Sequence, residues 1–326
     1  MSAAHVPVLG REATDALLPG PGRRLVDATY GAGGYSRMLL DAGAEVIGFD
    51  RDPSAVANAS AHERLTMIEA PFDRMAEALA ERGLSPVDGV VFDLGVSSMQ
   101  LDQAPRGFSF LRDGPLDMRM GEGTPASEFV NTADEADIAD VLYQYGEERK
   151  SRRLARAICQ DRPFHTTGAL AKLAESVLGT REKIHPATRM FQAIRILVND
   201  ELGQVVRGLI AAERVLRAGG RLAVVTFHSL EDRIVKRFLA RAAGGSEARS
   251  RYEPASEIVP PTLTPVSRKA ITPGEDEQAA NPRARSAKLR VAERTDQPPM
   301  GWPDAALAGL GAPALTFSDL QRRWAA

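Results

Sequence analysis

The chain has 326 residues, 44% of them hydrophobic and 26% charged, which is the composition of an ordinary globular protein with one large domain or two. The 41 Lys and Arg residues nearly balance the 43 Asp and Glu residues, so the net charge of -2 excludes a global positive field but leaves room for a local basic face. Cys159 is the only cysteine, which excludes an intrachain disulfide and a multi-thiolate metal site and favours a reducing compartment.

No segment has the features of an export signal or a membrane anchor. The first residues lack a basic region followed by a continuous apolar core, and no apolar run reaches the length that a bilayer requires. We therefore expect a cytoplasmic protein.

Strands and helices alternate in the first third of the chain. A helix over 11–18 is followed by a strand from Leu25, and further strands are predicted at 44–50, 65–70 and 87–93, with helices that begin near 36, 53 and 73. Alternation at this spacing predicts an α/β fold built on a doubly wound, mostly parallel sheet.

The alternation stops after Gly95 and resumes with an apolar fifth strand at 220–227. Roughly a hundred residues of helical pattern lie between these two points, which is too many for a connection. We therefore predict an inserted helical subdomain over 105–198. The sheet domain is then discontinuous and consists of 1–104 and 199–295.

The last part of the chain is less regular. Residues 242–264 are rich in Gly, Ser, Glu and Pro and are expected to form a surface loop. The segments 265–272 and 286–293 are predicted as the last two strands, forming an antiparallel edge. The remainder, 296–326, is rich in Pro, Gly and Ala, so we expect a loosely ordered tail with a short helix at 317–324.

The segment Leu25–Ser36 reads as a buried strand that runs into a glycine-rich turn and then a helix. Glycine permits the positive φ and the close backbone approach that a bound ligand needs, and the free N–H groups of the following helix suit a nucleotide-like cofactor. An ordinary strand-to-helix turn is the simpler interpretation, and the turn alone favours it.

Asp50 ends the second predicted strand, 19 positions after Gly31. An acidic residue there is suited to bind the hydroxyls of a cofactor ribose, and a helix cap formed with Asp52 and Pro53 explains it equally well. A dinucleotide fingerprint needs a third glycine, and Ser36 stands at that position. The pattern therefore favours S-adenosylmethionine, which has no pyrophosphate, over a nicotinamide or flavin cofactor.

Two more strand ends carry candidate residues. Phe72 follows the third predicted strand, where its ring would lie against an adenine, although its residue type favours plain core. Asp93 ends the fourth strand and should open onto the same crevice as Gly31 and Gly33, because ligands of open α/β sheets bind at the carboxyl ends of the strands. Its carboxylate is suited to accept a hydrogen bond from a substrate amino group, or to cap its own turn.

Candidate substrate contacts lie mainly in the predicted insert. The segment 106–119 is too polar for a core and too aromatic for a linker, which favours a substrate lid slightly over a surface loop anchored by Phe108 and Phe110. Six basic residues crowd the next part of the insert and form either a solvated helix face, the usual case, or a phosphate-binding surface: Arg149, Lys150, Arg152, Arg153, Arg156 and Arg162.

A later helix of the insert should begin at Pro186 and continue, directly or through a second helix, over 202–216. Three polar side chains fall on one side of this helix and face either the crevice or water: Gln192, Arg195 and Asn199. His228 closes the fifth strand on the crevice side. Because it has no partnering acid or nucleophile at a recognisable spacing, we expect a substrate contact at most and not a catalytic base.

Taken together, these motifs resemble the bacterial family of S-adenosylmethionine-dependent methyltransferases that modify a cytosine N4 in small-subunit (16S) ribosomal RNA. The resemblance runs from His5 to Thr295 and is carried by specific motifs: Gly31-Ala-Gly-Gly-Tyr-Ser36, Asp50-Arg-Asp-Pro53, Asp93-Leu-Gly-Val-Ser-Ser98, Arg106-Gly-Phe-Ser-Phe110, Asp113-Gly-Pro-Leu-Asp-Met-Arg119, Tyr145-Gly-Glu-Glu-Arg149, His185-Pro-Ala-Thr-Arg189, Phe227-His-Ser-Leu-Glu-Asp232 and Asn281-Pro-Arg-Ala-Arg-Ser286.

The resemblance implies S-adenosylmethionine as the cofactor and small-subunit ribosomal RNA, or the assembled small subunit, as the partner, with the target base flipped out and no metal. The implied cofactor contacts are Gly33, Gly34, Tyr35, Asp50, Phe72, Asp93 and Gln100. Asp93 is, by its position, our candidate acceptor for the amino group in catalysis. We expect substrate contacts from Phe108, Arg119, Arg152, Arg153, Arg195 and His228.

The sequence departs from the family pattern at two positions. Family members commonly carry His where Tyr35 stands and Pro where Met99 stands, and Tyr35 is expected to contribute mainly backbone contacts. Many amino-methyltransferases place Pro-Pro-aromatic after the strand-end acid, whereas Leu94 follows Asp93 here. A non-enzymatic RNA-binding ribosome assembly factor and a nicotinamide oxidoreductase remain alternatives, while the large insert and its basic stretch favour a macromolecular over a small-molecule substrate.

Overall fold

The computed structural model describes residues 7–95, 103–180, 184–245, 260–303, 308–311 and 316–324. The chain divides into two compact units, which we call the sheet unit (1–95 and 204–312) and the helical unit (96–203 and 313–326). The polypeptide leaves the sheet unit after strand β4 (Val87–Asp93) and returns to it within one helix, α11 (Glu201–Val215).

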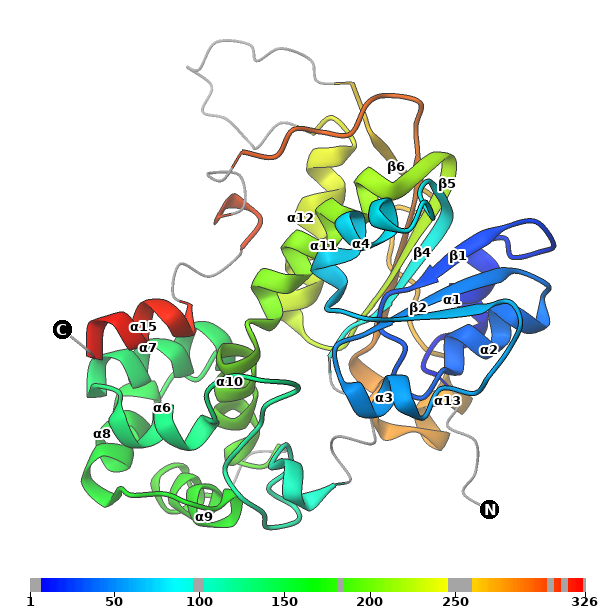
Figure 1. Cartoon of the computed structure of the whole chain (residues 1–326). Helices are drawn as coiled ribbons and strands as arrows, with labels where there is room; N and C mark the ends of the chain where they lie inside the picture. Colours follow the sequence, from blue (N-terminus) through cyan, green and yellow to red (C-terminus); the bar gives the residue numbers. More distant parts are fainter. Residues whose placement is uncertain are drawn as a thin grey trace, which may run out of the picture. The chain divides into compact units, whose positions relative to one another are not determined.

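One mixed sheet forms the centre of the sheet unit (Figure 1). Within the described ranges it has seven strands in the order β3-β2-β1-β4-β5-β7-β6. Their bounds are Arg24–Asp27 for β1, Glu45–Asp50 for β2, Leu65–Glu69 for β3, Val87–Asp93 for β4, Leu216–Thr226 for β5, Leu263–Pro265 for β6 and Lys288–Arg294 for β7. Strands β1 to β5 run parallel, and β7 is antiparallel to β5 and β6. The predicted α/β class with a mostly parallel sheet is confirmed.

Helices cover both faces of this sheet (Figure 1). On one face lie α1 (Gly10–Ala16) and α2 (Gly34–Asp41), and on the other α4 (Met75–Glu81), α11 and α12 (Ser229–Ala242); α3 (Pro53–Ala57) and α13 (Glu275–Ala280) are short. Because β4 is covered on both faces, its residues form a continuous apolar run, in which Val90, Val91 and Phe92 are at most 1% exposed.

The strand order places a topological switch point between β1 and β4. From β1 the sheet continues through β2 and β3 in one direction and through β4 and β5 in the other. Asp27, the last residue of β1, pairs in register with Gly48 of β2 and Val91 of β4, so the carboxyl ends of these three strands lie at one edge of the sheet. This edge is where open α/β sheets bind their ligands.

The second half of the sheet differs in detail from the prediction. Strand β5 begins at Leu216 and not at 220, directly after α11. The edge is antiparallel as predicted, but β6 covers Leu263–Pro265 in place of 265–272, and Ile271 makes only an isolated bridge to Leu289. Pro265 has no N–H to donate to β7, but Val266 just beyond it donates to the carbonyl of Val291 at 2.9 Å.

The helical unit is built from α6 (Ala126–Thr132), α7 (Glu135–Gly146), α8 (Ser151–Asp161), α9 (Thr167–Leu178), α10 (Ala187–Asn199) and α15 (Phe317–Trp324). Helix α7 packs against both α8 and α10. Pro186 is the N-cap of α10, and Phe191, Ile194 and Leu197 of that helix are buried, as the apolar spacing predicts. Asp200 adopts a left-handed φ of 47° and ends α10, so α10 and α11 are separate helices.

Two parts of the segment 296–326, expected to be a loosely ordered tail, pack on the rest of the chain. In the sheet unit the ring of Trp302 stacks on Phe238 at 5.0 Å, and its indole N–H donates to the buried Glu213. In the helical unit α15 forms as predicted, and Phe317 lies 6.3 Å from the ring of Phe129.

Candidate active site

The glycine turn after β1 has the conformation that its sequence predicts. Gly31 and Gly33 have φ values of 53° and 72°, in the left-handed region that favours glycine, and Gly33 is the N-cap of α2. A Cβ atom at Gly33 would lie 2.7 Å from the hydroxyl oxygen of Tyr30. Any side chain at this position is therefore disfavoured by both backbone conformation and space.

Asp50 ties the glycine turn to β2. Its Oδ2 accepts a hydrogen bond from the N–H of Gly31 at 2.8 Å, and its Oδ1 accepts one from the N–H of Asp52 at 2.9 Å. The helix cap considered for Asp50 is formed by Asp52, whose carboxylate accepts from the N–H of Ser54. Asp50 is half-buried, and burial raises its pKa. Each of its oxygens retains a lone pair for a further donor, which fits a ribose hydroxyl.

A buried acid beneath the turn was not among the predicted site residues. Asp27 is 0% exposed, and its Oδ2 accepts from both the N–H and the hydroxyl of Ser36, at 3.2 and 2.7 Å. Burial raises the pKa of Asp27 to about 6. The signal that could have revealed it is an acid at the end of an otherwise apolar strand, Leu25-Val-Asp27.

Asp93 closes β4 at the same edge of the sheet. Its N–H donates to the hydroxyl oxygen of Thr29 at 2.7 Å. Its carboxylate Oδ1 is buried and accepts no hydrogen bond from any residue that the structure describes. Burial, followed by the charges of Asp27 and Glu231, raises the pKa of Asp93 well above the ordinary range. A buried carboxylate oxygen without a partner fits a donor from a ligand or substrate.

Two predicted cofactor contacts also have roles in packing. The ring of Phe72 meets Phe92 edge-on at 5.4 Å, and a Cβ atom on Gly208 of α11 would lie 2.5 Å from it, so the core role that its residue type favours is present. The Tyr35 side chain is 3% exposed and donates to the carbonyl of Val8, which leaves mainly its backbone for a ligand. Gln100 lies outside the described residues.

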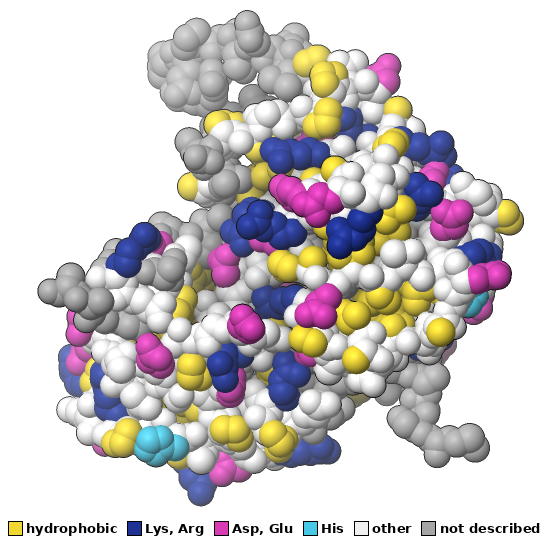
Figure 2. Space-filling view, in the orientation of Figure 1, with side chains coloured by type: hydrophobic (Ala, Val, Ile, Leu, Met, Phe, Trp, Pro, Cys, Tyr) yellow, Lys and Arg dark blue, Asp and Glu magenta, His cyan; other side chains and the backbone are white. Residues whose placement is uncertain are grey.

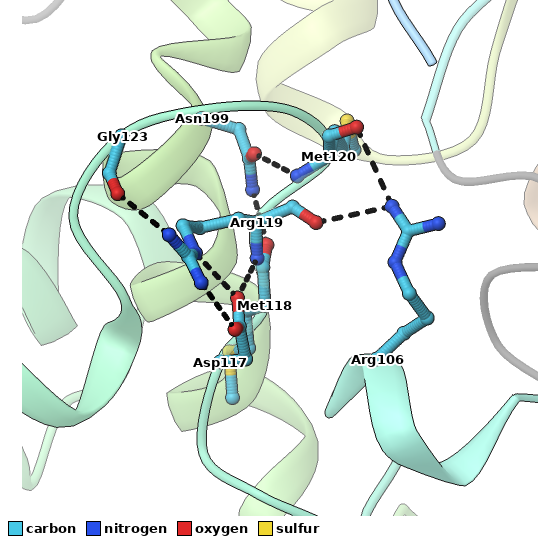
Figure 3. A network of polar contacts seen from close by, with 7 residues as sticks. All are labelled: Arg106, Asp117, Met118, Arg119, Met120, Gly123 and Asn199. Atoms are coloured by element: carbon cyan, nitrogen blue, oxygen red, sulfur yellow. Dashed lines mark hydrogen bonds and ion pairs between the residues drawn. The ribbon is translucent and has the colours of Figure 1, made fainter. Parts of the chain in front are cut away.

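The segment considered as a lid is tightly bonded within the helical unit (Figure 3). Arg119 forms a bidentate pair with Asp117, with both N–O distances at 2.8 Å, and donates to the carbonyl of Gly123. Arg106 donates to the carbonyl of Arg119, and Asn199 of α10 bonds two further backbone groups of the same turn. These bonds hold the two ends of the segment within the helical unit, and a role as a substrate lid stays a prediction.

Several predicted substrate contacts are buried or bonded within the helical unit. Phe108 is 5% exposed, and Arg195 pairs with Glu201 through two contacts of 2.7 and 2.9 Å. Gln192 donates to the carbonyl of Tyr145. The three polar side chains of α10 thus each bond another part of the helical unit, and Gln192 and Arg195 remain partly exposed. Arg119 and Arg195 each pair with an acid of the helical unit, and their contact with RNA stays a prediction.

The basic stretch of the insert separates into two kinds of residue. Arg162 donates to the carbonyls of Asn131 and Ala133 at 2.8 Å and so caps the end of α6. Arg156 lies 3.6 Å from Glu135. Arg152 and Arg153, on the exposed side of α8, keep their charge on the surface, so they remain candidates for contact with phosphates.

His228 is the N-cap of α12. Its ring accepts from the N–H of Glu231, and the Glu231 carboxylate accepts from the N–H of His228, which completes a capping box. The second ring nitrogen lies 3.0 Å from Glu231 Oε1, at an angle that makes no regular hydrogen bond. This local role explains a histidine here without a substrate.

The topology and the strand-end carboxylates together are those of a Rossmann-like, S-adenosylmethionine-dependent methyltransferase. Residues 2–295 match the model of the MraW methylase family, and the chain belongs to that family. Across the ranges that the structure covers, we find no helix with both the length and the apolar character to span a bilayer.

Curated relatives from three bacteria share more than half of their residues with this chain. The protein of Novosphingobium aromaticivorans is 55% identical over 311 residues, covering 91% of this chain and 94% of the relative. That of Rhizorhabdus wittichii is 56% identical over 310 residues, covering 92% and 96%. That of Caulobacter vibrioides is 55% identical over 309 residues, covering 91% and 98%. Each is named ribosomal RNA small subunit methyltransferase H.

Proposed function

We propose that this protein transfers a methyl group from S-adenosylmethionine to the exocyclic N4 of a cytidine in small-subunit ribosomal RNA, in the cytoplasm. The observation that carries the proposal is the buried Oδ1 of Asp93, which accepts no hydrogen bond from any described residue, at the carboxyl end of β4 beside the glycine turn of β1. The names of the curated relatives support ribosomal RNA as the substrate.

The sheet unit supplies the cofactor site. Asp50 would accept hydrogen bonds from ribose hydroxyls, and the backbone of Gly33, Gly34 and Tyr35 would hold the amino-acid end of the cofactor at the start of α2. When bound, S-adenosylmethionine supplies an electrophilic methyl group on a sulfonium centre. Phe72 and Gln100 complete the contacts that we assign to this site.

Asp93 supplies the acceptor that the substrate requires. The amino nitrogen of cytosine shares its lone pair with the ring and is a weak nucleophile. A carboxylate that accepts a hydrogen bond from the amino N–H returns electron density to the nitrogen and fixes the orientation of the amino group. Burial makes Asp93 a stronger base than an ordinary aspartate, because it raises the pKa of the carboxyl group. Correct positioning of the amino group contributes much of the remaining rate.

The helical unit supplies contacts to the RNA backbone. Flipping the target base out of its stack costs about a few kcal/mol, which has to be offset by binding elsewhere. Arg152 and Arg153 are exposed on α8 and are suited to phosphates. Figure 2 shows basic and acidic side chains interspersed on the visible face, so any RNA contact there is local and not the effect of a broad positive field.

Incorporation of labelled methyl groups tests the reaction class. Purified small subunits that lack the modification, incubated with the protein and methyl-labelled S-adenosylmethionine, should gain label in N4-methylated cytidine by nucleoside mass spectrometry. An unmodified subunit would instead indicate an assembly factor without catalytic activity. Binding of NADH in place of S-adenosylhomocysteine would indicate the oxidoreductase alternative.

A further inference from the structure

Thr29 lies two residues beyond the end of β1, the strand that pairs with β2 on one side and with β4 on the other. The N–H of Ala28 still bonds the carbonyl of Val91 in β4 at 2.9 Å. Two residues later, the N–H of Tyr30 bonds the carbonyl of Phe49 in β2, also at 2.9 Å. Thr29 therefore lies directly between a backbone hydrogen bond to β4 and one to β2, immediately after β1 ends between these two strands.

The departure of β1 would leave the last N–H of β4 without a backbone partner. This N–H belongs to Asp93, and the hydroxyl oxygen of Thr29 accepts its hydrogen bond at 2.7 Å. Buried backbone N–H groups are almost always paired, because leaving one unpaired is costly. A side chain thus replaces the strand carbonyl that the switch point removes, and it does so at the residue we assign to catalysis.

Thr29 is itself held by the buried acid beneath the glycine turn. Its N–H donates to Asp27 Oδ1 at 3.3 Å, while Asp27 Oδ2 accepts from the N–H and the hydroxyl of Ser36. A continuous set of hydrogen bonds therefore runs from the first turn of α2 through Asp27 and Thr29 to Asp93. The two halves of the site, the glycine turn and the end of β4, are linked through one threonine side chain.

We propose that Thr29 is the positioning residue for Asp93. Its hydroxyl fixes the backbone of Asp93, and so the catalytic carboxylate, relative to the glycine turn. This proposal rests on the function proposed above. The required group is the hydroxyl oxygen, which serine also provides and valine lacks. Valine nearly matches the shape of threonine, so Thr29→Val removes the acceptor with little change in volume.

Three variants separate this role from a general effect on the fold. Thr29→Val removes the acceptor, Thr29→Ser retains it, and Thr14→Val makes the same chemical change in α1, where the buried Thr14 hydroxyl donates to the carbonyl of Gly10. Amide hydrogen exchange of Asp93, measured by nuclear magnetic resonance on the protein alone, reports the bond directly. Steady-state methylation and the affinity for S-adenosylhomocysteine report its consequence.

In Thr29→Val we expect exchange of the Asp93 amide to accelerate about tenfold. We also expect kcat to fall between about tenfold and a hundredfold, with a smaller change in S-adenosylhomocysteine affinity. Thr29→Ser should restore most of the slow Asp93 amide exchange and most of kcat. Thr14→Val should leave the exchange rate and kcat unchanged. The proposal is overturned if Thr29→Val behaves like Thr14→Val, or if serine is as damaging as valine. If the wild-type protein does not methylate ribosomal RNA, the proposed function fails, and amide exchange and cofactor affinity still decide whether Thr29 places Asp93.

Discussion

Gly31 and Asp50 are joined by a hydrogen bond of 2.8 Å from the backbone N–H of the glycine to the carboxylate of the acid. The bond connects the turn after β1 to the end of β2, so the acid shapes the turn as well as offering lone pairs to a ligand. A substitution at Asp50 should therefore affect cofactor binding through both roles.

Asp50→Asn should weaken S-adenosylhomocysteine binding by about tenfold or more, because an amide has only one acceptor oxygen for the two backbone N–H groups that Asp50 now satisfies. Isothermal titration calorimetry measures the change. Asp15→Asn, at an exposed position on α1, is the matched control and should bind normally. Equal affinities for the two variants would rule out Asp50 as a cofactor contact.

Asp27→Asn should change how stability depends on pH. The folded-state pKa of Asp27 is about 6 against an ordinary 3.8, so folding favours the protonated form. This group's contribution to stability is therefore lost as pH rises from about 4 to about 6, by up to about 3 kcal/mol. Urea unfolding across this range should show that the difference in free energy of unfolding between wild type and variant shrinks towards low pH. A difference that is constant with pH would contradict the buried, raised pKa.

Asn199→Ala should destabilise the helical unit by about 2–4 kcal/mol, because it leaves both the carbonyl of Met118 and the N–H of Met120 without their partner (Figure 3). Met118 has a left-handed φ of 60°, so the turn depends on such bonds to persist. Chemical unfolding, with exchange of the Met120 amide as a local probe, measures the effect. Gln160→Ala, at an exposed position on α8, should be neutral, and similar values for both would show that the amide is dispensable.

Charge reversal of Arg152 and Arg153 together should weaken RNA binding about tenfold or more and lower the slope of log affinity against log salt by about two. The reason is the loss of two phosphate contacts and of the counterions that they release. Filter binding at several salt concentrations measures both quantities. Arg11→Glu, at an exposed arginine of α1, controls for a charge reversal elsewhere on the surface, and an unchanged salt slope in the double variant would remove α8 from the RNA interface.

Local patterns in the sequence predicted most of the sheet unit. The strand at 87–93 is visible because it is continuously apolar, and the helix after Pro186 because its apolar residues recur at helical spacing. Proximity of residues far apart in sequence is not visible in such patterns. Asn199 bonds Met118, 81 positions away, and Arg162 caps α6 by bonding Asn131, 31 positions away. From the sequence alone, both are therefore interpreted as surface polar residues. The contact of Thr29 with the Asp93 N–H depends on where β1 ends beside β4, 64 positions along the chain.

In the proposed reaction, the carboxylate of Asp93 accepts a hydrogen bond from the amino group during methyl transfer. The direct test is single-turnover methylation of small subunits by wild type and Asp93→Asn, with all enzyme bound to cofactor and with the rate followed against pH. We predict that the wild-type rate falls at low pH, around a pKa above the ordinary aspartate range, because the acceptor has to be ionised. In Asp93→Asn the rate at saturating cofactor should fall at least about a hundredfold, and this pH dependence should disappear. A variant that keeps full turnover and only binds the cofactor more weakly would contradict the claim.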